Sequence, residues 1–201
     1  LVTIFGNITQ LVTTIIFGVL AFLFFSSQYT YLIFTKSDYG IYILFVLSVV
    51  VLTVLMYLLY NVSQLSSLFS RWKFLEKYKS YAPVFSLFSA KDISKVLFLS
   101  MLRYGVYSFQ FYLLIKFANI EINLLQSLTM SALTFLSMSI IPTIALTELG
   151  VRGSVAIYFF GFISSNALGI MTASFALWII NLVVPAIIGV FFVYQLKFFR
   201  K

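Results

Sequence analysis

Long apolar runs dominate this 201-residue sequence and leave few charges between them. Hydrophobic residues make up 62% of the chain and charged residues only 9%, which is too little polar surface to cover a water-soluble domain of this size. The repeated runs of about 20 apolar residues match helices that cross a bilayer, whereas a β-barrel would show short segments alternating in period two. The sequence therefore predicts an all-α integral membrane protein folded as a polytopic helix bundle.

The chain is expected to form one transmembrane domain over residues 1–201. Helix is favoured even where valine and isoleucine are frequent, because an open strand in lipid leaves its backbone groups unpaired. The predicted full spans are about 7–25, 41–60, 96–117 and 168–194, and two shorter helices are predicted at about 124–141 and 148–162.

Basic residues are concentrated in two places that suggest an orientation. Residues 63–95 hold six of the thirteen basic residues, and residues 197–201 hold three more. Such clusters beside membrane spans mark cytoplasmic segments and attract anionic lipid head groups. We expect a cytoplasmic loop at 63–95, a cytoplasmic C-terminus and a bacterial inner membrane, with membrane lipids as partners and no nucleic acid. Lys116 and Glu121 flank the opposite, outer end of the third span, and their charges cancel.

The composition also excludes several kinds of chemistry. The chain has no cysteine and no histidine, which removes disulfides, thiolate metal sites and imidazole acid–base catalysis. Among its five acidic residues, Asp38 and Asp92 stand alone in separate loops, so metal–nucleotide chemistry is not expected. We predict no metal, no cofactor and no catalytic residue.

Residues 139–161 interrupt the apolar pattern with a proline, glycines, an acid and a base. Pro142 ends one apolar run, and the helices predicted on either side of the break, 124–141 and 148–162, are short for a hydrocarbon core of about 30 Å. Such breaks are tolerated where protein or a wet cavity surrounds them. We expect a re-entrant helical hairpin here. Two full crossings are the open alternative, since both arrangements leave the last span in the same direction.

The charges in this break form the candidate site. A helix that starts near Thr147 directs its free N–H groups into the break, with Glu148 in its first turn and Arg152 one turn later on the same face. Arginine beside a helix N-terminus suits a phosphate or another anionic head group. An ion pair at i and i+4 that merely neutralises two charges is the competing interpretation.

Arg103 is a further candidate within the third predicted span. It lies about 10 Å from the expected start of that helix at 1.5 Å per residue. Its side chain is expected either to extend back to the inner surface or pair structurally, or else to face the bundle interior.

Hydroxyl side chains recur at helical spacing in two predicted helices. For both stripes, close packing of small residues is preferred to a polar path. They comprise Thr9 and Thr13 with Gln10, and Ser127, Ser131 and Thr134.

The motif around the break resembles a known family. Pro142, a small-residue loop and LGVRG at Leu149–Gly153 are similar to the signature of the lysylphosphatidylglycerol synthase transmembrane family. This flippase-like family includes the membrane half of the multiple peptide resistance factor. Gly6–Gly18 and the basic central loop also resemble the corresponding parts. Family members are usually longer, so an N-terminal part is expected to be missing here.

Pro142, Gly150 and Arg152 are the residues of this chain that match the family's motif directly. The family usually has a glutamate directly after the arginine, where this sequence has Gly153, so Glu148 as the functional acid is our inference. The resemblance implies lipid translocation or the handling of lipid-linked groups.

The expected function is that of a lipid flippase-like transporter that handles an anionic or lipid-linked head group near Arg152. An integral membrane transferase acting on lipid-linked substrates and a non-catalytic membrane scaffold are the alternatives, and a homo-oligomer is left open. The expected substrate-binding residues are Arg152, Glu148, Thr147, Gly150, Pro142 and Arg103.

Overall fold

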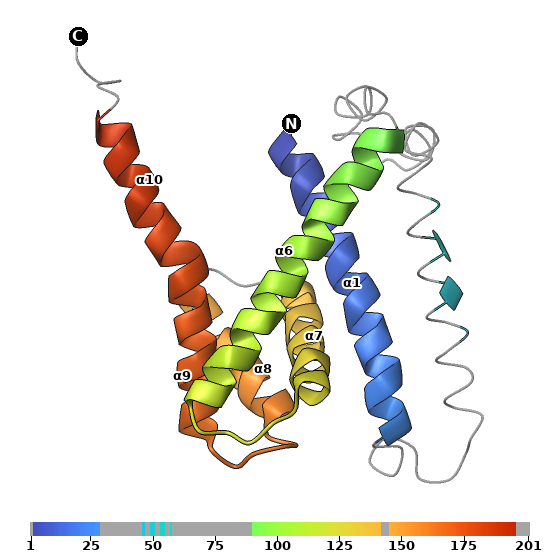
Figure 1. Ribbon diagram of the computed structural model, residues 1–201, viewed down its shortest axis with the longest axis vertical. Helices are drawn as coiled ribbons and strands as arrows, with labels where there is room; N and C mark the ends of the chain where they lie inside the picture. The colour runs from blue at the N-terminus through green and yellow to red at the C-terminus, as the bar shows by residue number, and fades with distance from the viewer. Residues whose placement is uncertain are drawn as a thin grey trace. The chain divides into compact units, whose positions relative to one another are not determined.

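The computed structural model describes residues 2–28, 46, 49–50, 53–54, 57, 90–141 and 145–195. Every regular element in these ranges is a helix and none is a strand, so the predicted all-α class is confirmed. The helices, labelled in Figure 1, are α1 (Val2–Gln28), α6 (Ala90–Phe117), α7 (Leu124–Ile140), α8 (Ala145–Phe160), α9 (Ala167–Trp178), the π-helix η2 (Ile179–Val183) and α10 (Val184–Gln195). The chain divides into two compact units, Leu1–Gly105 and Val106–Lys201, which are described separately.

Some predicted features lie outside the described residues. Within the predicted span 41–60, the described positions are helical, and the Thr53 hydroxyl donates to the Val49 carbonyl at 2.8 Å. The loop around Asp38, residues 63–89 of the basic loop, Pro142 and the tail 197–201 are outside the described part.

In the N-terminal unit, a buried hydroxyl pair joins α1 to α6. Thr9 Oγ1 and Ser100 Oγ lie 3.0 Å apart, and both side chains are buried. Because the Thr9 hydroxyl donates to the Gly6 carbonyl, the Ser100 hydroxyl is the donor to Thr9. Thr13 is also buried and donates to the Thr9 carbonyl. These contacts support packing for the α1 hydroxyl stripe.

Helix α6 begins at Ala90, six residues before its predicted start. Ile93 and Leu97 are buried, followed at helical spacing by buried Ser100 and Tyr104. One apolar stripe therefore extends back into residues that were predicted to belong to the cytoplasmic loop. The charges around Ile93 made this segment resemble a loop, although the acid in the first turn suits a helix N-terminus.

The C-terminal unit is built around aromatic and aliphatic side chains of α6, α7 and α8. Phe111 and Phe160 are buried with their ring centroids 4.9 Å apart, and Phe135 lies 6.1 Å from Phe111. Helix α8 packs against both α7 and α9 (Figure 1). Ser127, Ser131 and Thr134 are buried along α7, which agrees with close packing of small residues.

Helices α7 and α8 form an antiparallel hairpin whose open end is closed by asparagines. Asn166 in the loop before α9 donates from Nδ2 to the carbonyl of Ala118, which follows α6, at 3.4 Å. Its Oδ1 accepts from the Gly169 N–H at the start of α9. Asn123 caps α7 in the same way, through a capping box with Gln126. The loops before α7 and after α8 therefore lie together.

The predicted span 168–194 is helical throughout but contains a π-turn. Pro185 has no N–H, and in an α-helix its ring would clash with the carbonyl four residues back, at Asn181. The widened turn relieves this clash, and the Val184 N–H bonds to the Ile179 carbonyl five residues back. Asn181 Nδ2 donates to the Leu177 carbonyl and to Gln110 Oε1, each at 2.9 Å.

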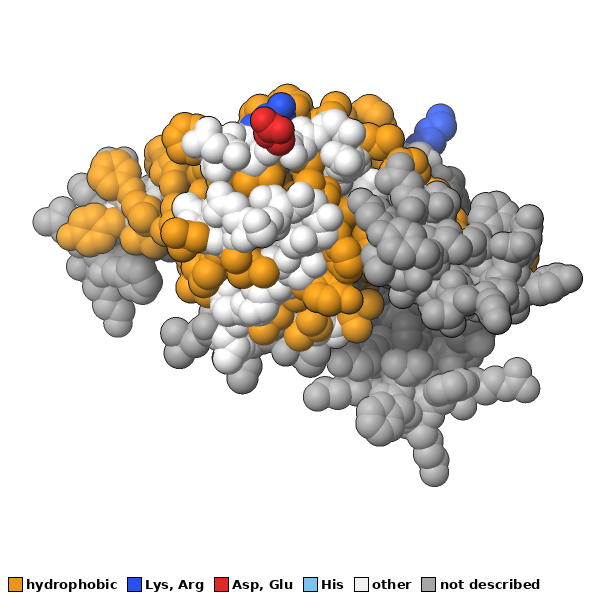
Figure 2. All heavy atoms as spheres, turned by 90° about the horizontal axis from the view of Figure 1, so that it is seen from below, with side chains coloured by type: hydrophobic (Ala, Val, Ile, Leu, Met, Phe, Trp, Pro, Cys, Tyr) orange, Lys and Arg blue, Asp and Glu red, His pale blue; other side chains and the backbone are white. Residues whose placement is uncertain are grey.

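Two helices in the described part are long and apolar enough to cross a membrane, Gly6–Phe25 and Ala167–Tyr194. Only 6% of the most apolar window of the second is buried, unlike the core helix of a soluble protein. Hydrophobic side chains also cover much of the face shown in Figure 2. Helix α6, predicted as a span, does not meet the same criterion, and Arg103 and Gln110 lower its hydropathy.

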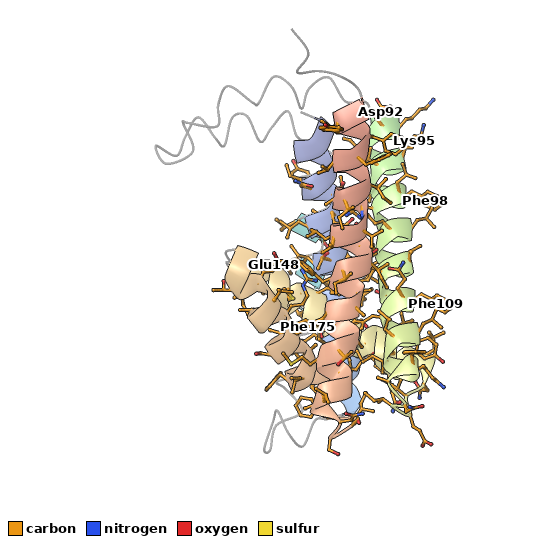
Figure 3. The ribbon with its side chains drawn as sticks, turned by 90° about the vertical axis from the view of Figure 1, so that its left-hand side faces the viewer. Asp92, Lys95, Phe98, Phe109, Glu148 and Phe175 are labelled. Atoms are coloured by element: carbon orange, nitrogen blue, oxygen red, sulfur yellow. The ribbon has the colours of Figure 1, made fainter. Side chains whose placement is uncertain are left out.

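Two phenylalanines on α6 provide a matched test of this core. We expect Phe111→Ala to lower the free energy of unfolding by about 3–5 kcal/mol, because it leaves a cavity against Phe160. Phe109 is half exposed and points outward (Figure 3), so Phe109→Ala is expected to cost less than about 1 kcal/mol. Denaturant unfolding of the reconstituted chain measures both, and equal losses would contradict the packing described.

Candidate functional site

The ion pair that was the competing interpretation of the sequence is present at the start of α8. The helix begins at Ala145, two residues before Thr147, and Glu148 lies in its first turn. Arg152 Nη2 donates to Glu148 Oε1 at 2.6 Å, and the two side chains are 22% and 29% exposed respectively. The pair is thus partly shielded from solvent but still reachable. An acid in the first turn is also favoured by the positive end of the helix dipole.

The guanidinium of Arg152 has hydrogen-bonding capacity left over. Its Nε is buried and has no partner in the part of the chain that the structure describes. A guanidinium carries five N–H donors in a planar fork, and the bond to Glu148 uses one nitrogen of that fork. Leaving a buried donor unsatisfied costs about 1–3 kcal/mol, so an acceptor that reached Nε would gain free energy.

Close packing against α9 fixes the position of the segment next to Arg152. Gly153 is buried, and a Cβ placed there would lie 3.3 Å from Phe175 Cε1 and 3.4 Å from Met171 Cγ. The Ser174 hydroxyl also donates to the Arg152 carbonyl at 3.5 Å. Figure 3 labels Glu148 on α8 and Phe175 on α9. A side chain at position 153 would therefore require the Phe175 ring to shift by a few tenths of an ångström.

The other two predicted site residues on α8 are both exposed. Gly150 is exposed, and a Cβ added to it would have no atom within 4 Å, so packing does not require glycine there. It lies about 200° around the helix from Glu148 at 100° per residue, which places it on the opposite face. Thr147 is exposed, one residue before Glu148. Pro142 lies outside the described residues.

Arg103 belongs to the N-terminal unit and is described there alone. Its side chain is exposed on α6, and its neighbours Leu102 and Val106 are about half exposed. Because α6 begins at Ala90, Arg103 lies about 20 Å along the helix axis, twice the predicted distance. This exposed position agrees with a side chain that extends along the helix surface rather than into the bundle.

Sequence reasoning missed two polar features of the C-terminal unit. The first is the amide bond between Gln110 and Asn181, for which the only signal was an amide side chain within each predicted span. The second is a pocket at the end of α6 lined in part by Lys116 and Glu121. These two charges were predicted only to cancel, but no ion pair joins them in the described structure. Among the described residues, no group of three or more potential side-chain ligands could hold a metal ion.

No family model, curated protein or solved structure matches the chain. The resemblance to the lysylphosphatidylglycerol synthase transmembrane family therefore depends on the motif residues alone.

The two glycines flanking Arg152 on α8 allow a paired stability test. We expect Gly150→Ala to raise the free energy of unfolding by about 0.5–1 kcal/mol, because alanine favours the helix and the space is open. At Gly153→Ala the same helical gain is offset by the contact with Phe175, so no net stabilisation is expected. Chemical denaturation of the two variants and the native chain measures the change in the free energy of unfolding at each position. Equal stabilisation at both positions would show that α9 does not approach α8 as closely as described.

Proposed function

We propose that the chain is a polytopic, flippase-like protein of a bacterial inner membrane with its C-terminus in the cytoplasm. The apolar surface of its last helix supports membrane insertion. Ile187 and Val190 of α10 are 65% and 70% exposed, and a long apolar helix with so little buried surface requires lipid or protein around it. The basic residues in 63–95 and 197–201 support the orientation through the positive-inside rule.

The α7–α8 hairpin supports a break within the membrane. Helix α7 has 17 residues and α8 has 16, so each is about 25 Å long against a hydrocarbon core of about 30 Å. Helices of this length fit a re-entrant hairpin that is enclosed by protein. Contacts of α8 with both α7 and α9 supply part of that enclosure.

The substrate we propose is a lipid with an anionic head group that binds at Arg152. The observation that carries this proposal is the reachable guanidinium with a buried Nε that has no partner among the described residues. A phosphate could take the place of the Glu148 carboxylate without leaving the arginine charge uncompensated, which avoids the main cost of breaking a buried ion pair. Phosphate also matches the donor fork of arginine bidentately. The motif resemblance points to the same class of substrate.

A structural scaffold is the second candidate. The observation that favours it is the short contact of 2.6 Å between Arg152 and Glu148, an i, i+4 pair that neutralises both charges. In that case the pair stabilises α8 and binds no lipid.

Leaflet exchange in proteoliposomes tests the transport proposal. We expect the native chain to move labelled anionic phospholipid between leaflets and Arg152→Gln to slow this exchange at least tenfold, because glutamine keeps polarity but loses the charge-assisted bonds. Lys91→Gln, which removes a charge at the exposed start of α6, is the matched control and should keep the native rate.

Exchanging the two charges separates the candidates. If the pair is only structural, Glu148→Arg combined with Arg152→Glu should recover whatever Arg152→Gln loses. If Arg152 binds the head group, the swapped chain should regain stability while its exchange stays slow. Native exchange by the folded Arg152→Gln chain would contradict the proposed site.

A further inference from the structure

An open pocket of about 610 Å³ lies where α6 ends and α7 begins. It belongs to the C-terminal unit and lies at the open end of the hairpin. Arg152 is the eighth of the 16 residues of α8, so about 12 Å of that helix lies between Arg152 and this end. Its lining combines a cation, an anion, two amides, a phenol and two aliphatic side chains. These residues are Tyr112, Lys116, Glu121, Ile122, Asn123, Leu124 and Gln126.

The pocket holds two opposite charges that do not neutralise each other. Lys116 Nζ lies 5.7 Å from the centroid of the Tyr112 ring, which positions the ammonium by a cation–π contact. Glu121 is exposed, and in the part of the chain described here its carboxylate has no hydrogen-bond or ion-pair partner. A ligand that carries both a negative and a positive group would complement the two charges.

The capping box of α7 leaves two further amide donors among the side chains that line the pocket. Asn123 Oδ1 accepts from the Gln126 N–H at 2.8 Å, and Gln126 Oε1 accepts from the Asn123 N–H at 3.2 Å. Because both amide oxygens are engaged by the backbone, the free end of each amide is its NH₂ group. Lys116 together with these two NH₂ groups gives a set of donors suited to phosphate oxygens.

Exposed apolar side chains belong to the lining or adjoin lining residues in the chain, which favours an amphiphile over a small soluble zwitterion. Leu124 belongs to the lining and is 45% exposed, and Leu125 beside it is 56% exposed. Phe117, next to Lys116 in the chain, is 88% exposed. Acyl chains would cover these side chains while the polar group occupies the pocket.

We propose that this pocket binds the head group of a phosphoethanolamine lipid. The phosphate is held by Lys116 and the NH₂ groups of Asn123 and Gln126, and the primary ammonium donates to the Glu121 carboxylate. A primary ammonium satisfies Glu121 with N–H donors that a quaternary choline group lacks. The site is separate from Arg152 and does not depend on the transport proposal.

Binding of defined phospholipids to the full chain, measured by native mass spectrometry, tests the assignment. We expect phosphatidylethanolamine to bind about fivefold more tightly than phosphatidylcholine or phosphatidylglycerol of the same acyl chains. Glu121→Gln should weaken the binding of phosphatidylethanolamine about fivefold and leave the binding of phosphatidylglycerol unchanged. Lys116→Met should weaken the binding of both lipids. Lys95→Met, at the far end of α6, removes an equal charge and should change neither.

Three results would overturn the proposal. One is equal binding of the three lipids by the native chain. Another is equal weakening of phosphatidylethanolamine and phosphatidylglycerol by Glu121→Gln, which would show that the carboxylate does not recognise the ammonium. The third is displacement of the lipid by soluble glycerophosphoethanolamine at matching concentration, which would assign the pocket to a soluble ligand. Glu121→Gln and Lys116→Met change exposed side chains, so we expect the unfolding temperature of both variants to equal that of the native chain. This measurement verifies that the variant chains are folded.

Discussion

The packing of α8 between α7 and α9 is the constraint on which the candidate site depends. Phe160 joins α8 to the core at Phe111, and Gly153 allows α9 to approach next to Arg152. Because α8 is held on both sides, its first turns present Glu148 and Arg152 at a fixed place, each partly shielded from solvent. Arg152 needs an anion at this place because its Nε is buried, whereas Glu148, whose side chain is 29% exposed, can be hydrated once it is displaced. This is why a phosphate that replaces the carboxylate, rather than a neutral group, fits the site we propose.

The hairpin has to move if the chain transports lipid as we propose. The hydroxyl stripe on α7 runs between the Arg152 end of the hairpin and the pocket near Lys116. Ser127, Ser131 and Thr134 in this stripe are all buried, so the structure offers no open polar path along α7. A head group that passed along this helix would have to separate it from its neighbours. The hydroxyl groups could then form hydrogen bonds with the head group in place of part of the water that it loses. Aliphatic side chains could not form such bonds.

The sequence predicted the helical class and the pairing of Glu148 with Arg152, because apolar run length and i, i+4 spacing are local properties. It misplaced the start of α6, since the burial of Ile93 depends on tertiary contacts that charge density does not reveal. Gly150 was expected near the pair because it belongs to the same motif, but helical geometry places it on the opposite face of α8. The pocket at Lys116 was missed for a related reason. Its two charges sum to zero in the sequence, and only the folded structure shows that both line one pocket.

We propose that α6 crosses the membrane and that the α7–α8 hairpin returns the chain to the same side. Since the chain has no cysteine, single cysteines at Lys91, Asn119 and Ser165 can be labelled with an impermeant maleimide in sealed vesicles of known orientation. Asn119 and Ser165 lie in the two loops joined by the Asn166–Ala118 bond, and Lys91 lies at the other end of α6. We predict that Asn119→Cys and Ser165→Cys react from the outer side and Lys91→Cys only from the cytoplasmic side. Reaction of all three from one side, or of Asn119→Cys and Ser165→Cys from opposite sides, would contradict the account.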